Sequence, residues 1–303
     1  MITPLPLHLP PRFHYEHTIY SHGWCALFPF HLTPEDLTLR YPLPGTGAKK
    51  DTLVFRAAGR ARATVGVEHR GTLSARRRER ATHAAAAILH CDLDLRPFYA
   101  RVRDDREFSW IARHNTGRML RGASFFEDTV KMILTTNCSW SLTTQMNARL
   151  LRYFGSGGDE ADSAAFPSPA AIADSSEGFL RSDVKLGYRA PFVLELARRC
   201  ASGALDIEEF RRSRLPSAEL YRELRAIKGV GEYAASGLLK LLGRYDRLGL
   251  DSWCRAKFAD IHNGGTPVSD DAIEAYYAPF EEWKGLVMWM DVTRDWYAEK
   301  FPF

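Results

Sequence analysis

Two glycines flank a valine at Gly229-Val230-Gly231, between segments with a helical pattern, and Asp251 follows before the next helical segment. A glycine in a helix interior costs about 1 kcal/mol relative to alanine, so this pair needs either a packing reason or a ligand that approaches the backbone. A turn between two helices points amide groups and the positive end of a helix dipole outward, which suits an anion. An ordinary turn, with Asp251 as a helix N-cap, would explain the same residues.

Helical periodicity surrounds the turn. Residues 217–227 and 232–243 flank it, with Ser217 as the expected N-cap of the first helix and Gly243 as the end of the second. Earlier in the chain, residues 124–136 and 141–155 repeat apolar side chains at helical spacing. We therefore expect a mostly helical region that contains a helical hairpin at 217–243.

The first 75 residues have a different pattern. Four stretches rich in aromatic and β-branched residues predict strands, at residues 12–20, 23–30, 52–59 and 62–73. The expected fold class is α+β. A small N-terminal antiparallel β domain with a trailing helix would span residues 1–80, and a mostly α-helical domain would span residues 81–303.

The composition, with 45% apolar and 26% charged residues, is that of a globular protein. We find no membrane-span pattern and no signal peptide, so we expect a cytoplasmic protein, nucleoid-associated if bacterial, with no membrane partner. Five scattered cysteines without a C-x-x-C pair predict reduced thiols and argue against an iron–sulfur cluster. The net charge of +4 permits a polyanionic partner.

Four stretches in order resemble the helix-hairpin-helix, Gly/Pro-Asp superfamily of DNA glycosylases, especially its 8-oxoguanine glycosylase and 3-methyladenine glycosylase II branches. They are residues 125–155, 185–198, 224–239 and 248–258. The likeness covers roughly residues 90 to 300, and both branches carry a sheet before the helical domain. The resemblance implies a monomeric base excision repair enzyme without a required cofactor, which flips a damaged purine out of double-stranded DNA and hydrolyses its N-glycosidic bond.

The resemblance assigns roles to the turn and the aspartate. Asp251 would be the catalytic carboxylate, and the amides of Gly229, Val230 and Gly231 would hold the DNA backbone. Tyr233 occupies the position where bifunctional members have a Schiff-base lysine, which implies a monofunctional enzyme. Neither Lys228, in the turn, nor Lys240, two helical turns further on, is expected to replace that lysine.

The resemblance also implies a wedge and a base pocket. Tyr188 would enter the base stack, while Arg189 and Asn137 would bond to the orphaned base. Aromatic walls that attract a cationic alkylated purine are expected from Tyr233, Trp253, Trp289 and Trp140. The superfamily's hairpin also binds a monovalent cation, and by position the ligands in this chain would be the backbone carbonyls of Arg225, Ile227 and Val230.

Two positions depart from the 8-oxoguanine branch. Leu142 stands where that branch has a cytosine-reading arginine, and Trp253 stands where it has a phosphate-contacting histidine. Alkylated bases such as 3-methyladenine and 7-methylguanine are therefore the expected substrates, ahead of 8-oxoguanine. An 8-oxoguanine-type glycosylase, a non-catalytic DNA damage-binding protein and a purely structural helical domain remain alternatives.

Overall fold

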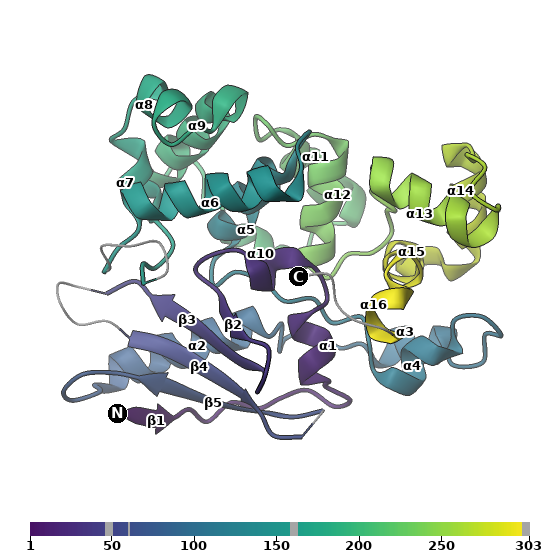
Figure 1. Ribbon diagram of the computed structural model, residues 1–303, viewed down its shortest axis with the longest axis horizontal. Coiled ribbons are helices and arrows are strands. Elements are labelled where there is room, and N and C mark those ends of the chain that lie inside the picture. Colours follow the sequence, from purple (N-terminus) through teal and green to yellow (C-terminus); the bar gives the residue numbers. More distant parts are fainter. Residues whose placement is uncertain (46–50, 60, 158–162, 299–303) are drawn as a thin grey trace.

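A five-stranded antiparallel sheet forms one end of the molecule, with strand order β1-β5-β4-β3-β2 (Figure 1). The computed structural model describes residues 1–45, 51–59, 61–157 and 163–298. The strands are β1 (Ile2–Pro4), β2 (His31–Thr33), β3 (Thr38–Leu43), β4 (Asp51–Ala57) and β5 (Ala63–Glu68). The alanine-rich helix α2 (Ala75–Ile88) packs on β4 and β5 with its alanine face buried. The α+β class with an N-terminal antiparallel sheet is thus confirmed.

Two of the four expected strands are wrong. Residues 12–20 contain helix α1 (Tyr15–Ile19), and residues 23–30 begin with the 3-10 helix η1 (Gly23–Ala26). The buried residues of α1, Tyr15, Thr18 and Ile19, are three and four positions apart, which is helical spacing, and η1 buries three consecutive residues. Neither element therefore has the alternating burial of a strand, although both are rich in apolar residues. β4 and β5 confirm the other two. The sequence did not indicate β1, β2 or β3. β1 and β2 have only three residues each, whereas β3 has six.

Helix α5 (Phe125–Thr135) lies at the centre of the helical part and is buried along nearly its whole length. It contacts α6 (Trp140–Phe154) and α12 (Glu232–Leu241). Ser124 caps α5 by accepting from the Glu127 amide, and α6 ends at Gly155, as the sequence predicts. Loops at the carboxyl end of α5 are therefore carried by a rigid, buried element.

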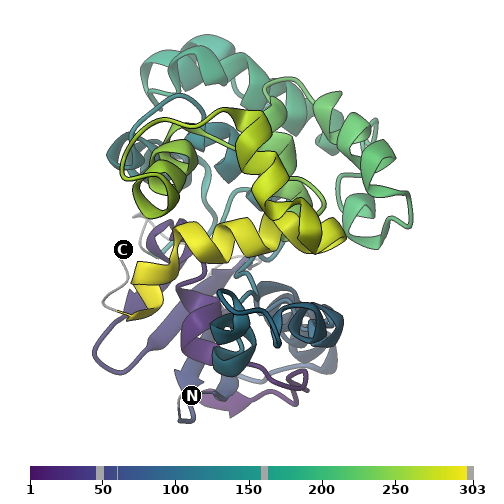
Figure 2. The ribbon, with the colours of Figure 1, turned by 90° about the vertical axis from the view of Figure 1, so that its right-hand side faces the viewer.

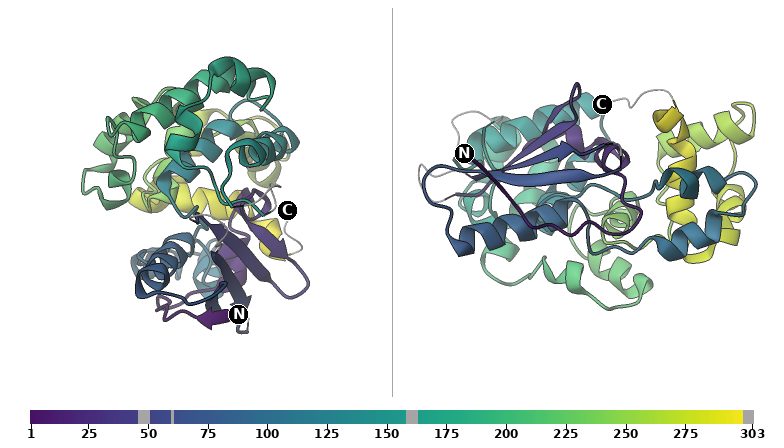
Figure 3. Two further views of the ribbon diagram at one scale, coloured as in Figure 1. Left: turned by 90° about the vertical axis from the view of Figure 1, so that its left-hand side faces the viewer. Right: turned by 90° about the horizontal axis from the view of Figure 1, so that it is seen from below.

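The remaining helices surround α5 and the C-terminal end. They are α3 (Arg96–Val102), α4 (Ser109–His114), α7 (Pro169–Ala173), α8 (Glu177–Ser182), η2 (Gly187–Arg189), α9 (Ala190–Ala201), α10 (Glu209–Arg212), α11 (Ser217–Arg225), α13 (Ser252–His262), α14 (Asp270–Tyr277), η3 (Ala278–Trp283), α15 (Lys284–Val292) and α16 (Arg294–Ala298). Helices α15 and α16 run between the upper helices and the N-terminal part (Figure 2). The sheet and α13–α16 occupy opposite ends of the molecule (Figure 3).

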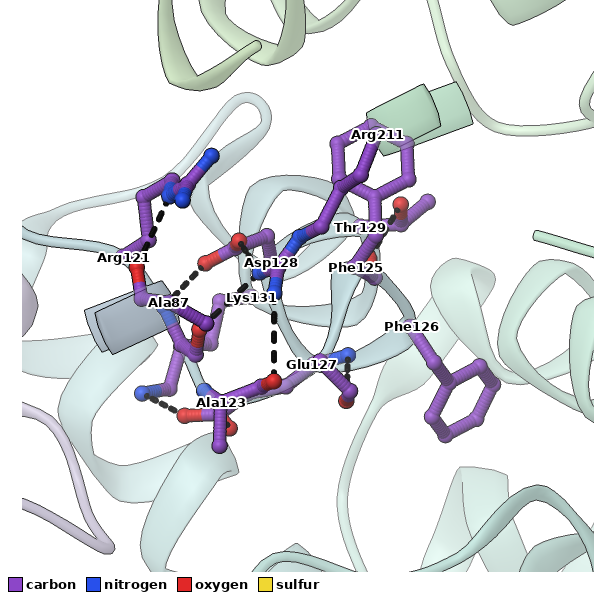
Figure 4. Close-up of polar contacts among 12 residues, drawn as sticks. Ala87, Arg121, Ala123, Phe125, Phe126, Glu127, Asp128, Thr129, Lys131 and Arg211 are labelled. Atoms are coloured by element: carbon purple, nitrogen blue, oxygen red, sulfur yellow. Dashed lines mark hydrogen bonds and ion pairs between the residues drawn. The ribbon is translucent and has the colours of Figure 1, made fainter. Parts of the chain in front are cut away.

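Buried polar contacts join the sheet to the helices. Tyr41 of β3 donates a hydrogen bond to Glu127 of α5, and Glu127 pairs with Lys131 at 2.6 Å (Figure 4). One hydrophobic core also runs through both parts. The expected domain boundary at residue 80 falls inside α2, so it would cut a helix rather than a linker.

Among the described residues, we find no helix that combines the length and the apolar composition needed to cross a bilayer.

Candidate active site

The hairpin consists of α11 and α12 joined by a short turn. Pro216, not Ser217, is the N-cap of α11, and its side chain makes no capping bond. The expected cap was wrong by one residue, because proline already has the extended backbone that an N-cap needs and Ser217 can join the first helical turn. The second helix ends at Leu241, and Gly243 follows with a left-handed φ of 76°.

The two glycines of the turn have different surroundings. Gly229 has a left-handed φ of 84°, and a Cβ atom there would lie 2.7 Å from Cβ of Phe192. Gly231 has an ordinary extended conformation, and a Cβ atom there would meet nothing within 4 Å. Packing and backbone geometry therefore explain Gly229 only. Gly231 is left with open space above its backbone, as a close-lying ligand requires.

The amide groups of the turn are not equivalent either. The Val230 N–H donates to the Ile227 carbonyl at 3.0 Å, so it is engaged inside the turn. Helix α12 begins after Gly231, which offers no side-chain cap to the amides of the first turn. Glu232 adds a negative charge there, but it pairs with Arg225 at 3.1 Å. The donors best placed for an anion are thus those at the start of α12 rather than that of Val230.

Asp251 is the N-cap of α13, and its Oδ1 accepts a hydrogen bond from the Cys254 amide at 2.7 Å. Its side chain is half-buried and lines a cavity of about 800 Å³. The N-cap interpretation is therefore confirmed, and the catalytic role stays a prediction that the cap permits, because a cap uses one oxygen of a carboxylate that has two. The preceding loop lies against α12, since a Cβ atom at Gly249 would be 2.6 Å from Cβ of Ser236.

All four aromatic residues expected in a base pocket line this cavity. They are Tyr233, Trp253, Trp289 and Trp140. The Trp253 ring centroid lies 6.1 Å from that of Trp289, and Trp140 lies across Gly23, where it leaves no room for a side chain. Burial raises the pKa of the Tyr233 phenol, and the charge of Asp251 acts in the same direction. Tyr233 therefore stays protonated beside the carboxylate.

Several cavity residues were not found by the sequence reasoning. Among them are Trp24, Lys240, Lys257, Asp295 and Trp296. Trp296 follows Trp289 by seven residues, a helical spacing that could have indicated a shared face. Its ring lies 5.8 Å from Trp253 and 5.9 Å from Trp289, so three indoles form one cluster in the wall.

A hydrogen bond to a carboxylate of helix α5 holds Trp24 in the cavity wall. Its indole N–H donates to Asp128 Oδ1 at 2.9 Å. Asp128 is fully buried and also pairs with Arg211 of α10 at 2.8 Å (Figure 4). A buried carboxylate needs such partners because desolvation disfavours its charge. The contact thus links η1 of the N-terminal part to α5 and α10.

Lys240 lies in the cavity wall, a position that the sequence reasoning did not consider. Two helical turns after Tyr233 it lies on the same face of α12, so it lines the same cavity. Its ammonium is buried and donates to the Leu248 carbonyl in the loop that leads to Asp251. Burial lowers the pKa of Lys240 to about 8. That Lys240 does not replace the Schiff-base lysine stays a prediction.

Asn137 and Tyr188, two of the three wedge residues, meet at the surface beside the cavity. The Tyr188 side chain is 44% exposed, and its hydroxyl lies 3.4 Å from Asn137 Nδ2 and 3.1 Å from the Thr136 carbonyl. The Tyr188 ring packs edge-on against Phe192, which also contacts Gly229 of the hairpin. The hairpin, the exposed tyrosine and the rim of the cavity are thus connected by direct contacts.

Arg189, the third residue of the expected wedge, is only 4% exposed. Its guanidinium donates to the Thr136 carbonyl and lies 4.4 Å from the Tyr188 ring centroid. Nε is shielded and has no partner among the described residues. In this structure Arg189 braces Thr136 and Tyr188 from below, and a role in bonding to an orphaned base stays a prediction.

Neither a protein-family model nor a curated protein sequence matches this chain. Solved structures do match it. The 3-methyladenine DNA glycosylase from Archaeoglobus fulgidus aligns with a TM-score of 0.72 at 16% identity, over 98% of this chain and 99% of that one. The 8-oxoguanine glycosylase/lyase of Clostridium acetobutylicum, bound to double-stranded DNA containing cytosine opposite 8-oxoguanine, aligns with a TM-score of 0.67 at 15% identity, over 97% and 98%.

A third match is more limited. The 3-methyladenine DNA glycosylase Mag1 of Schizosaccharomyces pombe, in complex with abasic DNA, has a TM-score of 0.53 at 17% identity and covers 65% of this chain and 95% of its own. At sequence identities this low, the matches are evidence for the fold alone. The chain has the fold of the DNA glycosylases of the 3-methyladenine and 8-oxoguanine types, which agrees with the resemblance seen in its motifs.

Proposed function

We propose that this protein is a DNA glycosylase that flips a damaged purine out of duplex DNA and hydrolyses its N-glycosidic bond. The observation that carries the proposal is the position of Asp251, a half-buried carboxylate that lines an aromatic cavity beside a helical hairpin. The cavity, at about 800 Å³, is within the range of small-molecule sites and is large enough for a purine base. The fold agrees, since the matching structures are glycosylases, two of them solved with DNA.

The chemistry follows from the charge of the reacting sugar. Loss of the base leaves an oxocarbenium-like centre at C1′, which a nearby carboxylate stabilises electrostatically. Asp251 supplies that charge and can orient the attacking water. The cap to Cys254 fixes the carboxylate through Oδ1, so little reorganisation is needed when positive charge develops.

Alkylated purines are the proposed substrates. Alkylation at N3 or N7 makes the attached base cationic, and indole faces attract a cation more strongly than they attract a neutral base. The cluster of Trp253, Trp289 and Trp296 offers three such faces in one wall. An 8-oxoguanine-type activity is the second candidate, because an enzyme of that type matches this fold over nearly its whole length.

The experiment is a panel of duplexes, each carrying one alkylated, oxidised or deaminated base, followed by alkali to cleave abasic sites. We expect release of 7-methylguanine or 3-methyladenine ahead of 8-oxoguanine, and loss of release in Asp251→Asn. Wild-type rates in the Asp251→Asn protein would overturn the assignment. Duplex binding without release of any base would favour the non-catalytic alternative, and no binding at low salt would favour a structural domain.

The proposal includes the absence of a lyase step. Tyr233 cannot form an imine, and Lys240 donates to a backbone carbonyl inside the fold. Borohydride should therefore trap no covalent complex between the wild-type protein and abasic DNA. A trapped complex that disappears in Lys240→Met would show instead that this lysine attacks C1′.

A monovalent cation at the hairpin is also proposed, on the carbonyls of Arg225, Ile227 and Val230. Neutral carbonyl oxygens are the ligands that such ions prefer, and the Ile227 oxygen keeps a second lone pair after accepting from Val230. Duplex affinity compared in sodium, potassium and tetramethylammonium salts at equal ionic strength tests this. Equal affinity in all three salts would contradict it.

A further inference from the structure

A histidine of the N-terminal part reaches the wall of the cavity. His22 directly precedes η1 and lines the cavity, and only 9% of the residue is exposed. Its Nε2 lies 2.7 Å from the carbonyl oxygen of Leu120. Because a carbonyl oxygen only accepts hydrogen bonds, Nε2 carries the proton of the ring. The other ring nitrogen, Nδ1, is therefore an acceptor as long as the ring is neutral.

The His22 ring is neutral near neutral pH. Burial lowers the pKa of His22 to about 4, and the charge of Lys131 acts in the same direction, whereas the bond to Leu120 and the charge of Asp128 oppose the shift. A neutral ring does not repel a cationic base, as a protonated ring would. Its lone pair is also free to accept a hydrogen bond.

The Nδ1 atom is both unpartnered and accessible. It makes no hydrogen bond to any described residue, and it is not shielded from solvent. Since so little of His22 is exposed and the residue lines the cavity, the accessible nitrogen faces that space. A donor that enters the cavity can therefore reach Nδ1.

Several contacts fix the position of the ring. The Leu120 amide donates to Ser21 Oγ at 3.0 Å, so both backbone groups of Leu120 are bonded to the segment Ser21–His22. The Trp289 indole donates to the Ser21 carbonyl at 2.9 Å, and the Trp24 ring packs edge-on against the imidazole with 4.8 Å between the ring centroids. A group that is already ordered binds a ligand without a further loss of conformational entropy.

The guest that matches a neutral acceptor carries an N–H group. Adenine has an amino group at N6, guanine has N1–H and an amino group at N2, and alkylation at N3 or N7 leaves these groups in place. 1,N6-Ethenoadenine attached to its sugar has no N–H group, because the etheno bridge occupies N1 and N6. Comparing it with an alkylated purine therefore tests for an acceptor in any orientation of the base.

We propose that Nδ1 of His22 accepts a hydrogen bond from an N–H group of the extruded purine, and that His22 thereby selects alkylated purines over etheno-bridged ones. This inference rests on the proposed function for its substrate. A site built to bond an N–H group discriminates strongly against an analogue that lacks it, because the acceptor is then left unpaired.

Two substitutions separate the two ring nitrogens. Glutamine can place its amide nitrogen where histidine has Nε2, so His22→Gln can keep the bond to Leu120 but lacks the acceptor at Nδ1. Asparagine can place its amide oxygen where histidine has Nδ1, so His22→Asn can offer an acceptor to the cavity but loses the bond to Leu120. His22→Asn is thus the matched control for His22→Gln.

The test measures single-turnover excision of 7-methylguanine and of 1,N6-ethenoadenine from matched duplexes. We expect His22→Gln to slow 7-methylguanine excision roughly tenfold to a hundredfold, as expected for one hydrogen bond to a charged group, while ethenoadenine excision changes less than about threefold. His22→Asn should unfold at a lower urea concentration, yet its selectivity for 7-methylguanine should stay within about threefold of wild type. Wild-type selectivity in His22→Gln, or the same loss of selectivity in both variants, would overturn the inference.

A second readout separates this inference from the proposed function. Five tryptophans line the cavity, so free 7-methylguanine should quench their fluorescence on binding, without any catalysis. If the wild-type protein releases no base from any duplex, the proposed function fails, and this titration then decides the inference. It also decides the inference if only one of the two bases is released. Affinity for free 7-methylguanine roughly threefold to tenfold weaker in His22→Gln than in wild type supports it. Equal affinity, or no binding to the wild-type protein, overturns it.

Discussion

A side chain at Gly229 would collide with Phe192, whereas one at Gly231, two residues later in the same turn, would enter open space. The protein itself requires a glycine at the first position, through packing and a left-handed φ of 84°. At the second position no packing contact requires one, and the reasons left are the N-cap preference of α12 for glycine and a ligand that lies against the backbone. The two substitutions to alanine should therefore separate folding from binding.

We expect Gly231→Ala to change the free energy of unfolding by less than about 1 kcal/mol, because the restriction of the unfolded chain by alanine is offset by its poorer fit at the N-cap of α12. The same change should weaken duplex binding roughly tenfold, since a methyl group would hold a phosphate away from the α12 amides. Gly229→Ala should instead lower the free energy of unfolding by more than about 1 kcal/mol. Urea unfolding and duplex titration at one salt concentration measure both. Equal duplex affinity of Gly231→Ala and the wild-type protein would mean that no DNA phosphate lies against the hairpin amides.

Asp251 has a capping and a proposed catalytic role, which two substitutions can separate. Asparagine is as good an N-cap as aspartate, so Asp251→Asn should keep wild-type stability, whereas Asp251→Ala should lose about 0.5–2 kcal/mol. Both should lose base release by about a hundredfold or more, because neither carries the charge. Unfolding curves and single-turnover excision are the measurements. A stable Asp251→Ala protein would contradict the cap.

The buried ammonium of Lys240 should make stability depend on pH. Burial lowers its pKa to about 8, and the negative charge of Asp251 opposes that shift. In the unfolded chain a lysine titrates near 10.4, so between these values the unfolded state binds more protons. The contribution of Lys240 to stability is therefore unfavourable below pH 8 and improves as the pH rises to about 10.4, by about 3 kcal/mol in all.

Lys240→Met isolates this contribution from those of other titrating groups. The unfolding free energy of the wild-type protein minus that of the variant should rise between pH 8 and 10.4 and be flat from pH 6 to 7.5. Urea unfolding at each pH measures it. A difference that stays constant across the whole range would mean that the ammonium is hydrated in the folded protein.

The buried ion pair between Arg211 and Asp128 should contribute more to stability than the exposed pair that Arg212 forms. Arg211→Met leaves a fully buried carboxylate without its charged partner, which should cost about 3–5 kcal/mol of stability. Arg212→Met is the control, since Arg212 pairs with Glu209 and both are more than 60% exposed. We expect it to cost less than about 1 kcal/mol. Similar losses in the two variants by thermal or urea unfolding would contradict the buried pair's role.

The local parts of the site could be predicted from the sequence. The turn at Gly229–Gly231, the end of α6 at Gly155 and the cap at Asp251 depend on backbone preferences and on contacts within a few residues. Such short-range features depend on residues that are close together in the sequence, so a short stretch of sequence is enough to predict them. The four aromatic residues expected in the pocket all line one cavity. They could be predicted because the motifs occur in the order of a known family, whose fold gives each motif its position.

Only the tertiary structure decided the rest of the cavity. The indole N–H of Trp289 donates to the carbonyl of Ser21, and 268 positions of sequence separate the two residues. No local pattern reports such a contact. Lys240, Asp295 and Trp24 entered the wall, and Arg189 turned inward, because burial depends on which segments pack together and on which partners satisfy each charge. The sequence alone determined which functional groups the chain carries. Packing in the tertiary structure determined which of those groups lie together in the cavity.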